Sequence, residues 1–98
     1  MLPFGLFRVS GKSMLPTFQS GNLLLGRQWL IRPKVGNIIV VLVENRSLIK
    51  RISAINGDQI EVLGDNVSFS TDSRSFGPIS RSCIQAKIIW RLSHTTKA

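Results

Sequence analysis

Short segments in which apolar and polar residues alternate, separated by turn-forming residues, cover most of this chain and predict a mostly β domain. No stretch shows the apolar spacing that marks an amphipathic helix. The run from Ile38 to Val43 is apolar throughout, which is typical of a strand buried on both faces at the centre of a sheet. The pattern predicts strands at residues 6–9, 22–28, 37–43, 47–55, 59–63 and 84–92.

Turn signals lie between these segments, and the pair Asn56-Gly57 is the clearest of them. Both central residues of a type I′ turn need positive φ, which Asn and Gly adopt at low cost. The pair therefore predicts that strands 47–55 and 59–63 form an antiparallel hairpin.

Lys50 interrupts the apolar pattern of the strand 47–55. Because side chains alternate between the two faces of a strand, Lys50 shares its face with Leu48, Ile52 and Ala54. Burial there would disfavour the charged ammonium and lower the pKa of Lys50, so that the neutral amine could act as a base. The alternative is that the long side chain carries its amine to the solvent-exposed rim.

The length of 98 residues suits a single hydrophobic core, so we expect one domain over residues 1–98 with a polar, flexible tail at 93–98. The longest apolar run is far shorter than the roughly 20 residues that span a bilayer, so no transmembrane helix is predicted. The N-terminus has neither a basic leader nor a small-residue cleavage site, so we expect a cytoplasmic protein.

The N-terminal segment contains four large apolar residues, Leu2, Phe4, Leu6 and Phe7. We expect them to pack as core or edge-strand cover, against the later aromatic and aliphatic side chains of the chain. They could instead rest on a lipid surface, which the positive charge of the chain would favour. Membrane contact is therefore an open alternative that we do not expect.

Composition narrows the candidate chemistry further. One cysteine, Cys83, and one histidine, His94, provide neither an intramolecular disulfide nor a metal-ligand spacing, so no metal and no cofactor are expected. The 13 basic residues outnumber the 5 acidic ones, giving a net charge of +8. The basic residues are spread along the chain without a charge run, so nucleic-acid binding is not expected, and a solvated surface or an acidic partner is the simpler explanation.

Ser13 lies between a flexible approach that contains Gly11 and an exit that Pro16 stiffens. This arrangement can expose the Oγ atom of Ser13 at a strand end, with the backbone N–H of the same residue as an oxyanion donor. The same composition is also typical of an ordinary loop, so the segment alone leaves both interpretations open.

Residues 13–17, Ser-Met-Leu-Pro-Thr, resemble the nucleophile box of the signal peptidase I (S26) family. Two further boxes follow in the order of that family: residues 48–52 with 56–58 resemble its lysine box, and residues 64–66 with 70–77 resemble its C-terminal box. Three boxes in one order are far more specific than any single one. The resemblance implies a compact, LexA-like catalytic core of short antiparallel strands.

The same resemblance implies a serine endopeptidase in which Ser13 is the nucleophile and Lys50 is the general base. It gives Ser70 the role of orienting the lysine through its hydroxyl group, and it gives the backbone N–H of Ser13 to the oxyanion hole. His94 lies outside the boxes and is not expected to act as a base.

Five further residues, four in the boxes and one just before the first box, are implied as support: Gly11, Met14, Pro16, Asp72 and Arg74. The last two match an acidic and basic pair, which we expect to hold the loop that carries the lysine-orienting serine. At the position of Gly11 some family members have a hydroxyl that serves as a second oxyanion donor. The second donor would therefore come from elsewhere, for example from Ser10 or a main-chain N–H.

Compared with typical family members, we expect a compact core with no N-terminal anchor, and only 15 positions separate Lys50 from Asp65, too few for an additional β domain between the last two boxes. In this respect it resembles the small maturation proteases of nickel superoxide dismutase, which remove an N-terminal propeptide. The resemblance implies a precursor protein as partner, the nickel superoxide dismutase proform, with the metal belonging to that substrate. The cleavage-site sequence and the oligomeric state are not predicted.

Three other functions remain as alternatives: a general signal peptidase-like protease at a membrane surface, a self-cleaving LexA-like peptidase, and an inactive basic binding module. The sequence has no DNA-binding domain and no Ala-Gly or Cys-Gly dipeptide, which argues against self-cleavage. The presence of Ser13, Lys50 and Ser70 together argues against an inactive module, because a dead enzyme has no chemical reason to keep all three.

Overall fold

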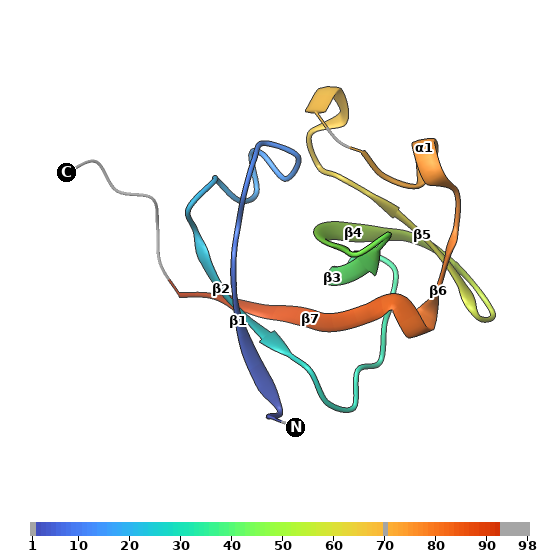
Figure 1. Ribbon diagram of the computed structural model, residues 1–98, viewed down its shortest axis with the longest axis horizontal. Coiled ribbons are helices and arrows are strands. Elements are labelled where there is room, and N and C mark those ends of the chain that lie inside the picture. Colours follow the sequence, from blue (N-terminus) through green and yellow to red (C-terminus); the bar gives the residue numbers. More distant parts are fainter. Residues whose placement is uncertain (1, 70, 93–98) are drawn as a thin grey trace.

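A computed structural model, in which residues 2–69 and 71–92 are described, shows seven β-strands in one antiparallel sheet. The strand order is β1-β2-β7-β3-β4-β5-β6 (Figure 1). The strands are β1 (Phe4–Arg8), β2 (Leu23–Arg27), β3 (Ile38–Val43), β4 (Arg46–Asn56), β5 (Gln59–Leu63), β6 (Ile79–Ser80) and β7 (Ile84–Arg91). The predicted fold class of short antiparallel strands is confirmed.

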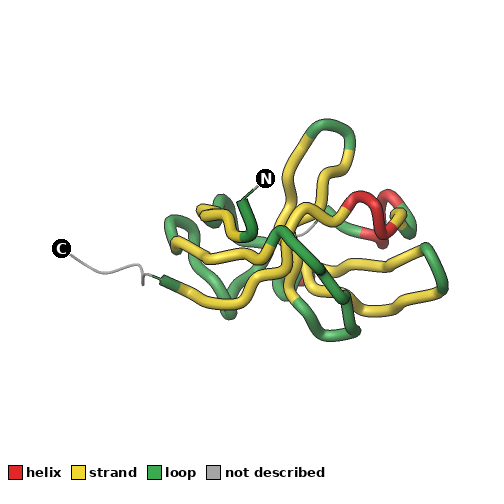
Figure 2. The backbone as a smooth tube through the Cα atoms, turned by 90° about the horizontal axis from the view of Figure 1, so that it is seen from below, coloured by secondary structure: helices red, strands yellow, loops and turns green. Residues whose placement is uncertain are grey.

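Helix is confined to single turns in the described part of the chain: the 3-10 helices η1 (Val67–Phe69) and η2 (Arg81–Cys83), and α1 (Ser73–Phe76). Strands and loops make up the rest of the described residues, as Figure 2 shows. None of the helices among residues 2–69 and 71–92 has the length and apolar character needed to cross a membrane. Ser70 and the predicted tail at 93–98 lie outside the described residues.

β3 occupies the central position of the sheet, between β7 and β4, as its continuously apolar sequence predicts. Ile39, Val40 and Val41 are 0%, 1% and 0% exposed, so that both faces of this strand are buried. One apolar cluster lies along β3, β4 and β5, and a second lies beneath the connection from β1 to β2. The buried members of the second cluster are Val9, Met14, Phe18 and Leu24.

The predicted β4–β5 hairpin is present, but its turn lies one residue later than expected. Asn56 pairs with Gln59, so the two connecting residues are Gly57 and Asp58, and Gly57 has a φ of 58°. Glycine at the first connecting position is typical of a type II′ turn, whereas the prediction was type I′. The turn with two positive φ values is instead the β3–β4 connection, at Glu44 and Asn45.

The N-terminal apolar segment does not pack as expected. Leu2, Phe4 and Leu6 are 75%, 48% and 61% exposed, and only Phe7 is half-buried. Exposed and half-buried side chains alternate strictly along β1, so Phe4 and Leu6 lie on the uncovered face of this edge strand. The expected burial against the later aromatic residues is therefore wrong for three of the four side chains.

Candidate active site

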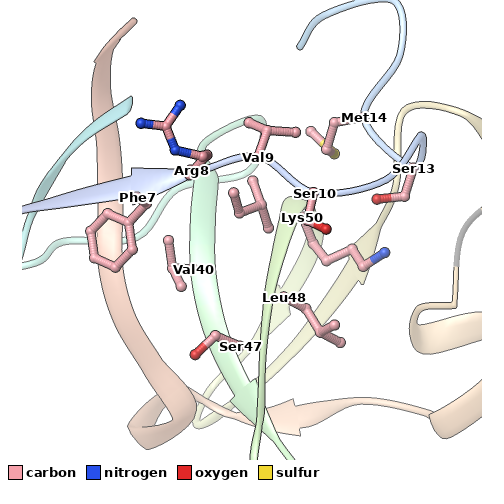
Figure 3. Close-up of a pocket in the computed structure, with 11 residues that line it drawn as sticks. Phe7, Arg8, Val9, Ser10, Ser13, Met14, Val40, Ser47, Leu48 and Lys50 are labelled. Carbon is pink, nitrogen blue, oxygen red and sulfur yellow. The ribbon is translucent and has the colours of Figure 1, made fainter. Parts of the chain in front are cut away.

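Ser13 and Lys50 line the same pocket, which has a volume of about 140 Å³. Ser13 comes from the serine loop (residues 9–22), which connects β1 to β2, and Lys50 comes from β4. The hydroxyl group of Ser13 and the amine of Lys50 point into the same part of the pocket (Figure 3). The same two residues also line an adjoining hollow of about 190 Å³, together with Thr71 and Phe69.

The serine loop is closed at its base by two backbone hydrogen bonds. The N–H of Val9 donates to the carbonyl of Asn22 at 2.9 Å, and the N–H of Gly21 donates to the carbonyl of Val9 at 2.8 Å. Met14, directly after the serine, is 1% exposed and belongs to the apolar cluster beneath the loop. Burial of Met14 therefore fixes the backbone next to Ser13.

The turn before the serine depends on Gly11, which has a φ of 82°. Side-chain-bearing residues are strained in this left-handed region, whereas glycine adopts it readily. The loop then leaves through Leu15 and Pro16, which are joined by a cis peptide bond. In the described part of the chain, the N–H of Ser13 donates to no backbone carbonyl.

The segment Gly64-Asp65-Asn66, which follows β5, is hydrogen-bonded to the serine loop. The N–H of Asn66 donates to the carbonyl of Ser13 at 2.8 Å, and its side-chain amide donates to the carbonyl of Lys12 at 3.0 Å. The hydroxyl group of Thr17 donates to the carboxylate of Asp65. Asn66 thus binds the carbonyls of the two peptide units that flank the Cα atom of Ser13.

Asp65 also connects the serine loop to the strand that carries the lysine. Arg51, next to Lys50 on β4, donates through Nε and Nη2 to the two carboxylate oxygens of Asp65 at 2.9 and 2.8 Å. The guanidinium of Arg51 is the main reason why the pKa of Asp65 is lowered, with the Thr17 hydroxyl acting in the same direction. The ionised Asp65 therefore fixes the serine loop relative to β4.

Lys50 is 3% exposed, between the half-buried Leu48 and the buried Ile52 on the same face of β4. The predicted alternation holds as far as Ile52 and then stops at a bulge, because Ile52 pairs with Val62 and Ala54 pairs with Glu61. The prediction that Lys50 faces apolar residues is confirmed, and the solvent-exposed alternative is wrong.

Burial is the main influence on the pKa of Lys50 and lowers it below 10.5. The carboxylate of Asp72 acts in the opposite direction, since a nearby negative charge favours the ammonium. The positive charges of Arg74 and Arg46 lower the pKa further. Lys50 therefore becomes neutral at a lower pH than a lysine in water does.

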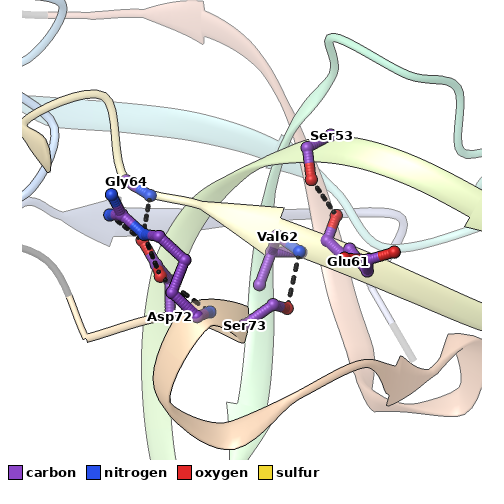
Figure 4. Close-up of polar contacts among 7 residues, drawn as sticks. Ser53, Glu61, Val62, Gly64, Asp72 and Ser73 are labelled. Carbon is purple, nitrogen blue, oxygen red and sulfur yellow. Dashed lines mark hydrogen bonds and ion pairs between the residues drawn. The ribbon is translucent and has the colours of Figure 1, made fainter.

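Asp72 and Arg74 pair as the sequence suggests, and they build the turn that packs behind the lysine. Arg74 donates through Nε and Nη2 to Asp72 at 2.9 and 2.6 Å, and the fully buried Asp72 also caps α1 and accepts from the N–H of Gly64 at 2.9 Å (Figure 4). Ser73 accepts a bond from the N–H of Val62 at 2.8 Å. These contacts attach the segment after Ser70 to the end of β5.

The comparison with known families matches residues 3–89 to a single description, Peptidase S24-like. The chain belongs to the Peptidase S24-like family. It is 32% identical to the mitochondrial ATP-independent inner membrane protease subunit 1b of Arabidopsis thaliana, over 84% of this chain and 66% of that protein. It is 33% identical to the mitochondrial inner membrane protease subunit 1 of Schizosaccharomyces pombe, over 89% of this chain and 74% of that protein.

The S24-like chain thus spans just under two thirds of the Arabidopsis relative and about three quarters of the fission yeast one. Kinship with signal-peptidase-like proteases, as the sequence predicts, is confirmed at this level. The names of the two relatives do not mention nickel superoxide dismutase, so the predicted likeness to its maturation proteases stays a prediction.

The contacts that hold the S24-like site together are not evident from the sequence. Thr17, Arg51, Asp65 and Asn66 were parts of the boxes to which no role was given, although they form the link between the serine loop and β4. Their presence in boxes of matching order was the available signal. Thr71, which lines the hollow beside Lys50, was also overlooked. Ser70, the predicted lysine-orienting residue, lies outside the described residues.

Proposed function

We propose that this S24-like family member is a serine endopeptidase in which Ser13 is the nucleophile and Lys50 is the general base. The observation that supports the proposal is a lysine residue, 3% exposed, that lines the same pocket as a serine. A buried amine of lowered pKa can be neutral in the active enzyme, and only the neutral form can accept a proton.

In the proposed reaction, Ser13 Oγ attacks the scissile carbonyl carbon as its proton passes to Nζ of Lys50. The backbone N–H of Ser13 donates to the oxyanion that forms on the carbonyl oxygen. The Lys50 ammonium then gives the proton to the departing amine, which leaves an acyl-enzyme. In the second half, neutral Lys50 takes a proton from water as the water oxygen attacks the acyl carbon; the bond from that carbon to Ser13 Oγ then breaks, and the Lys50 ammonium returns the proton to Oγ, which regenerates both residues.

Three further hydroxyl-bearing residues are candidates for supporting roles in the proposed reaction. Ser10 lines both hollows next to Ser13 and is the candidate for the second oxyanion donor. Ser70 keeps its predicted role of orienting the amine of Lys50. Thr71 offers a further hydroxyl group, since it lines the same hollow as Lys50.

The shape of the pocket favours an extended substrate with a small apolar side chain beside the scissile bond. Its walls include Val9, Val40 and Leu48, and its volume is about 140 Å³. β1 is at the edge of the sheet and pairs only with β2, so a peptide could add to it as a further strand next to the pocket. The proposed reaction is removal of an N-terminal leader or propeptide from a precursor protein.

The nickel superoxide dismutase proform, and a cytoplasmic location, stay predictions from the sequence. The relatives are named as inner membrane protease subunits, which favours precursors presented at a membrane as a second class of substrate. Both classes share the same chemistry at Ser13 and Lys50.

The proposal is tested by incubating the purified chain with candidate precursors, including the nickel superoxide dismutase proform, and identifying the products by mass spectrometry. Ser13→Ala, Lys50→Met and Lys50→Arg should each reduce cleavage by about three orders of magnitude or more, since arginine stays protonated. Ser53→Ala, an exposed serine on the same strand as Lys50, should retain full activity. Cleavage by Ser13→Ala would refute the mechanism, and a cut in the enzyme alone would show self-cleavage.

A further inference from the structure

A second pocket lies at the other end of β2 from the serine loop. It has a volume of about 340 Å³ and is lined by Arg27, Leu30, Ile31, Arg32, Lys34 and Lys87, which we call the basic pocket. The register of β1 and β2 separates the two sites: Arg8, before the serine loop, pairs with Leu23, whereas Arg27 pairs with Phe4 at the opposite end. Figure 1 shows the connection after β2 on the side of the N-terminus, away from the serine loop.

Four of the six residues that line the basic pocket are cations, and no carboxylate of the described residues lines it with them. The sequence has five Asp and Glu residues, all of them described, and none of them lines this pocket. None of the four cations takes part in an ion pair with another described residue. Four of the 13 basic residues of the chain are therefore gathered at this point.

Two of the cations face each other directly. Arg27 on β2 and Lys87 on β7 are cross-strand partners, and both side chains are half-buried. Like charges in this position destabilise a sheet, and partial burial weakens the screening of their repulsion by solvent. An anion bound between them would convert this repulsion into attraction.

The geometry of the donors suits a phosphate group. The Nε atom of Arg27 donates to the carbonyl of Trp29 at 2.8 Å, which orients the guanidinium at the pocket. A guanidinium pairs with phosphate oxygens through parallel hydrogen bonds, and lysines add point charges. Four cations exceed what a single carboxylate would neutralise, so a phosphate dianion or a diphosphate fits better.

Leu30, which lines the pocket, and Trp29, the residue before it, indicate that the phosphate carries an organic group. Trp29 and Leu30 are 56% and 54% exposed, and Leu30 has a φ of 50°. A non-glycine residue in this region is strained, and such strain is concentrated at binding sites. The strained loop thus presents two large apolar side chains next to four cations.

We propose that the basic pocket binds a phosphate ester, either the headgroup of an anionic phospholipid or a soluble phosphate compound. The two sources share the interaction of the phosphate with Arg27 and Lys87 and the contact of the organic group with Trp29 and Leu30. The site is separate from Ser13, so its failure would leave the peptidase proposal intact.

Inorganic pyrophosphate is the first probe, measured by calorimetric titration of the full chain at physiological salt. The wild-type chain should bind it saturably and show a higher melting temperature in its presence. Arg27→Gln with Lys87→Gln should weaken binding about tenfold or more. The matched control, Arg81→Gln with Arg91→Gln, removes the same charge outside the pocket and should change binding less than about twofold.

The melting temperature without pyrophosphate separates a binding defect from a folding defect. The pocket variant should melt at or above the wild-type temperature, because the facing like charges are removed. An equal loss of affinity in both double variants would show that only net charge matters and would overturn the site. Absence of saturable pyrophosphate binding to the wild-type chain would overturn it as well.

Vesicles distinguish the two sources. The chain is sedimented with phosphatidylcholine vesicles, with and without about one third phosphatidylglycerol. Binding only to the anionic vesicles, lost in the pocket variant and displaced by pyrophosphate, would assign a lipid headgroup. Pyrophosphate binding without vesicle binding would assign a soluble phosphate ester. Vesicle binding that neither the pocket variant nor pyrophosphate affects would overturn the headgroup assignment.

Discussion

Two aspartate–arginine pairs flank the proposed site, and they differ in what they connect. Asp65 accepts bonds from Arg51, 14 positions before it, and from Thr17, 48 positions before it. Asp72 accepts bonds from Arg74, two positions after it, and from Gly64, eight positions before it. The first pair joins distant segments of the fold, whereas the second builds one local turn.

The pairs also differ in burial and in their effect on Lys50. The side chain of Asp72 is 0% exposed and that of Asp65 is 15% exposed. Asp72 and Arg74 both influence the pKa of Lys50, in opposite directions, whereas neither Asp65 nor Arg51 is among the groups that shift it. The molecule therefore separates the positioning of the proposed nucleophile, Ser13, from the electrostatics of the proposed base, Lys50.

The largest effect on folding is expected from Asp72→Ala. The substitution leaves the buried N–H of Gly64 without its acceptor and removes the cap of α1, so we expect a loss of about 3 kcal/mol in the free energy of unfolding. Asp65→Ala should cost only about 1 kcal/mol, because its partners are partly exposed and can be hydrated. Urea unfolding of the two variants measures the difference, and equal losses would contradict the distinction.

The second effect concerns activity. Asp65→Ala should lower kcat/KM about 10- to 100-fold while the chain stays folded, because the serine loop loses its connection to β4. Thr17→Val should produce part of this loss alone and little more in the Asp65→Ala background. Precursor cleavage assays on the single and double variants test the coupling. Strictly additive losses, or unchanged turnover in Asp65→Ala, would show that the link does not position Ser13.

The strands and the burial of Lys50 could be predicted because both follow from a local period. Alternation along β4 placed Lys50 on the face of Leu48 and Ile52, and the structure places it there. The pattern fails where the period is interrupted. The bulge after Ile52 ends the alternation, and the hairpin turn is formed by Gly57 and Asp58 and not, as predicted, by Asn56 and Gly57. Neither irregularity changes the hydrophobic pattern, so the sequence alone does not reveal it.

The links that hold the site could not be predicted from spacing. The bond between Thr17 and Asp65 joins residues 48 positions apart, and no sequence period specifies such a contact. The N-terminal apolar residues failed for a related reason, because the exposure of Leu6 depends on which strands lie beside β1 and what covers them. The boxes identified which residues belong to the site, but the fold decides what each residue contacts.

The smallest expected effect is a displacement of the pH profile of cleavage, which reports on the charges around Lys50. Cleavage should rise with pH as Lys50 loses its proton, and the midpoint of kcat/KM against pH should lie below that of a free lysine, because burial lowers the pKa of Lys50. In the same interval folding stability should also rise with pH, since the unfolded chain, with its higher lysine pKa, binds more protons than the folded chain. Lys50→Met should remove this part of the stability gain.

Arg46→Gln removes a positive charge that lowers the pKa of Lys50, so its pH profile should move to higher pH. Thr17→Val should lower the rate at every pH without moving the midpoint, because its contact is with Asp65 and not with a group that shifts Lys50. The midpoint of kcat/KM against pH measures the free enzyme, so a change in substrate affinity alone does not mimic the displacement. The opposite result is a midpoint that moves in Thr17→Val and stays fixed in Arg46→Gln. It would show that the link through Asp65 affects the protonation of Lys50 and that the charge of Arg46 does not.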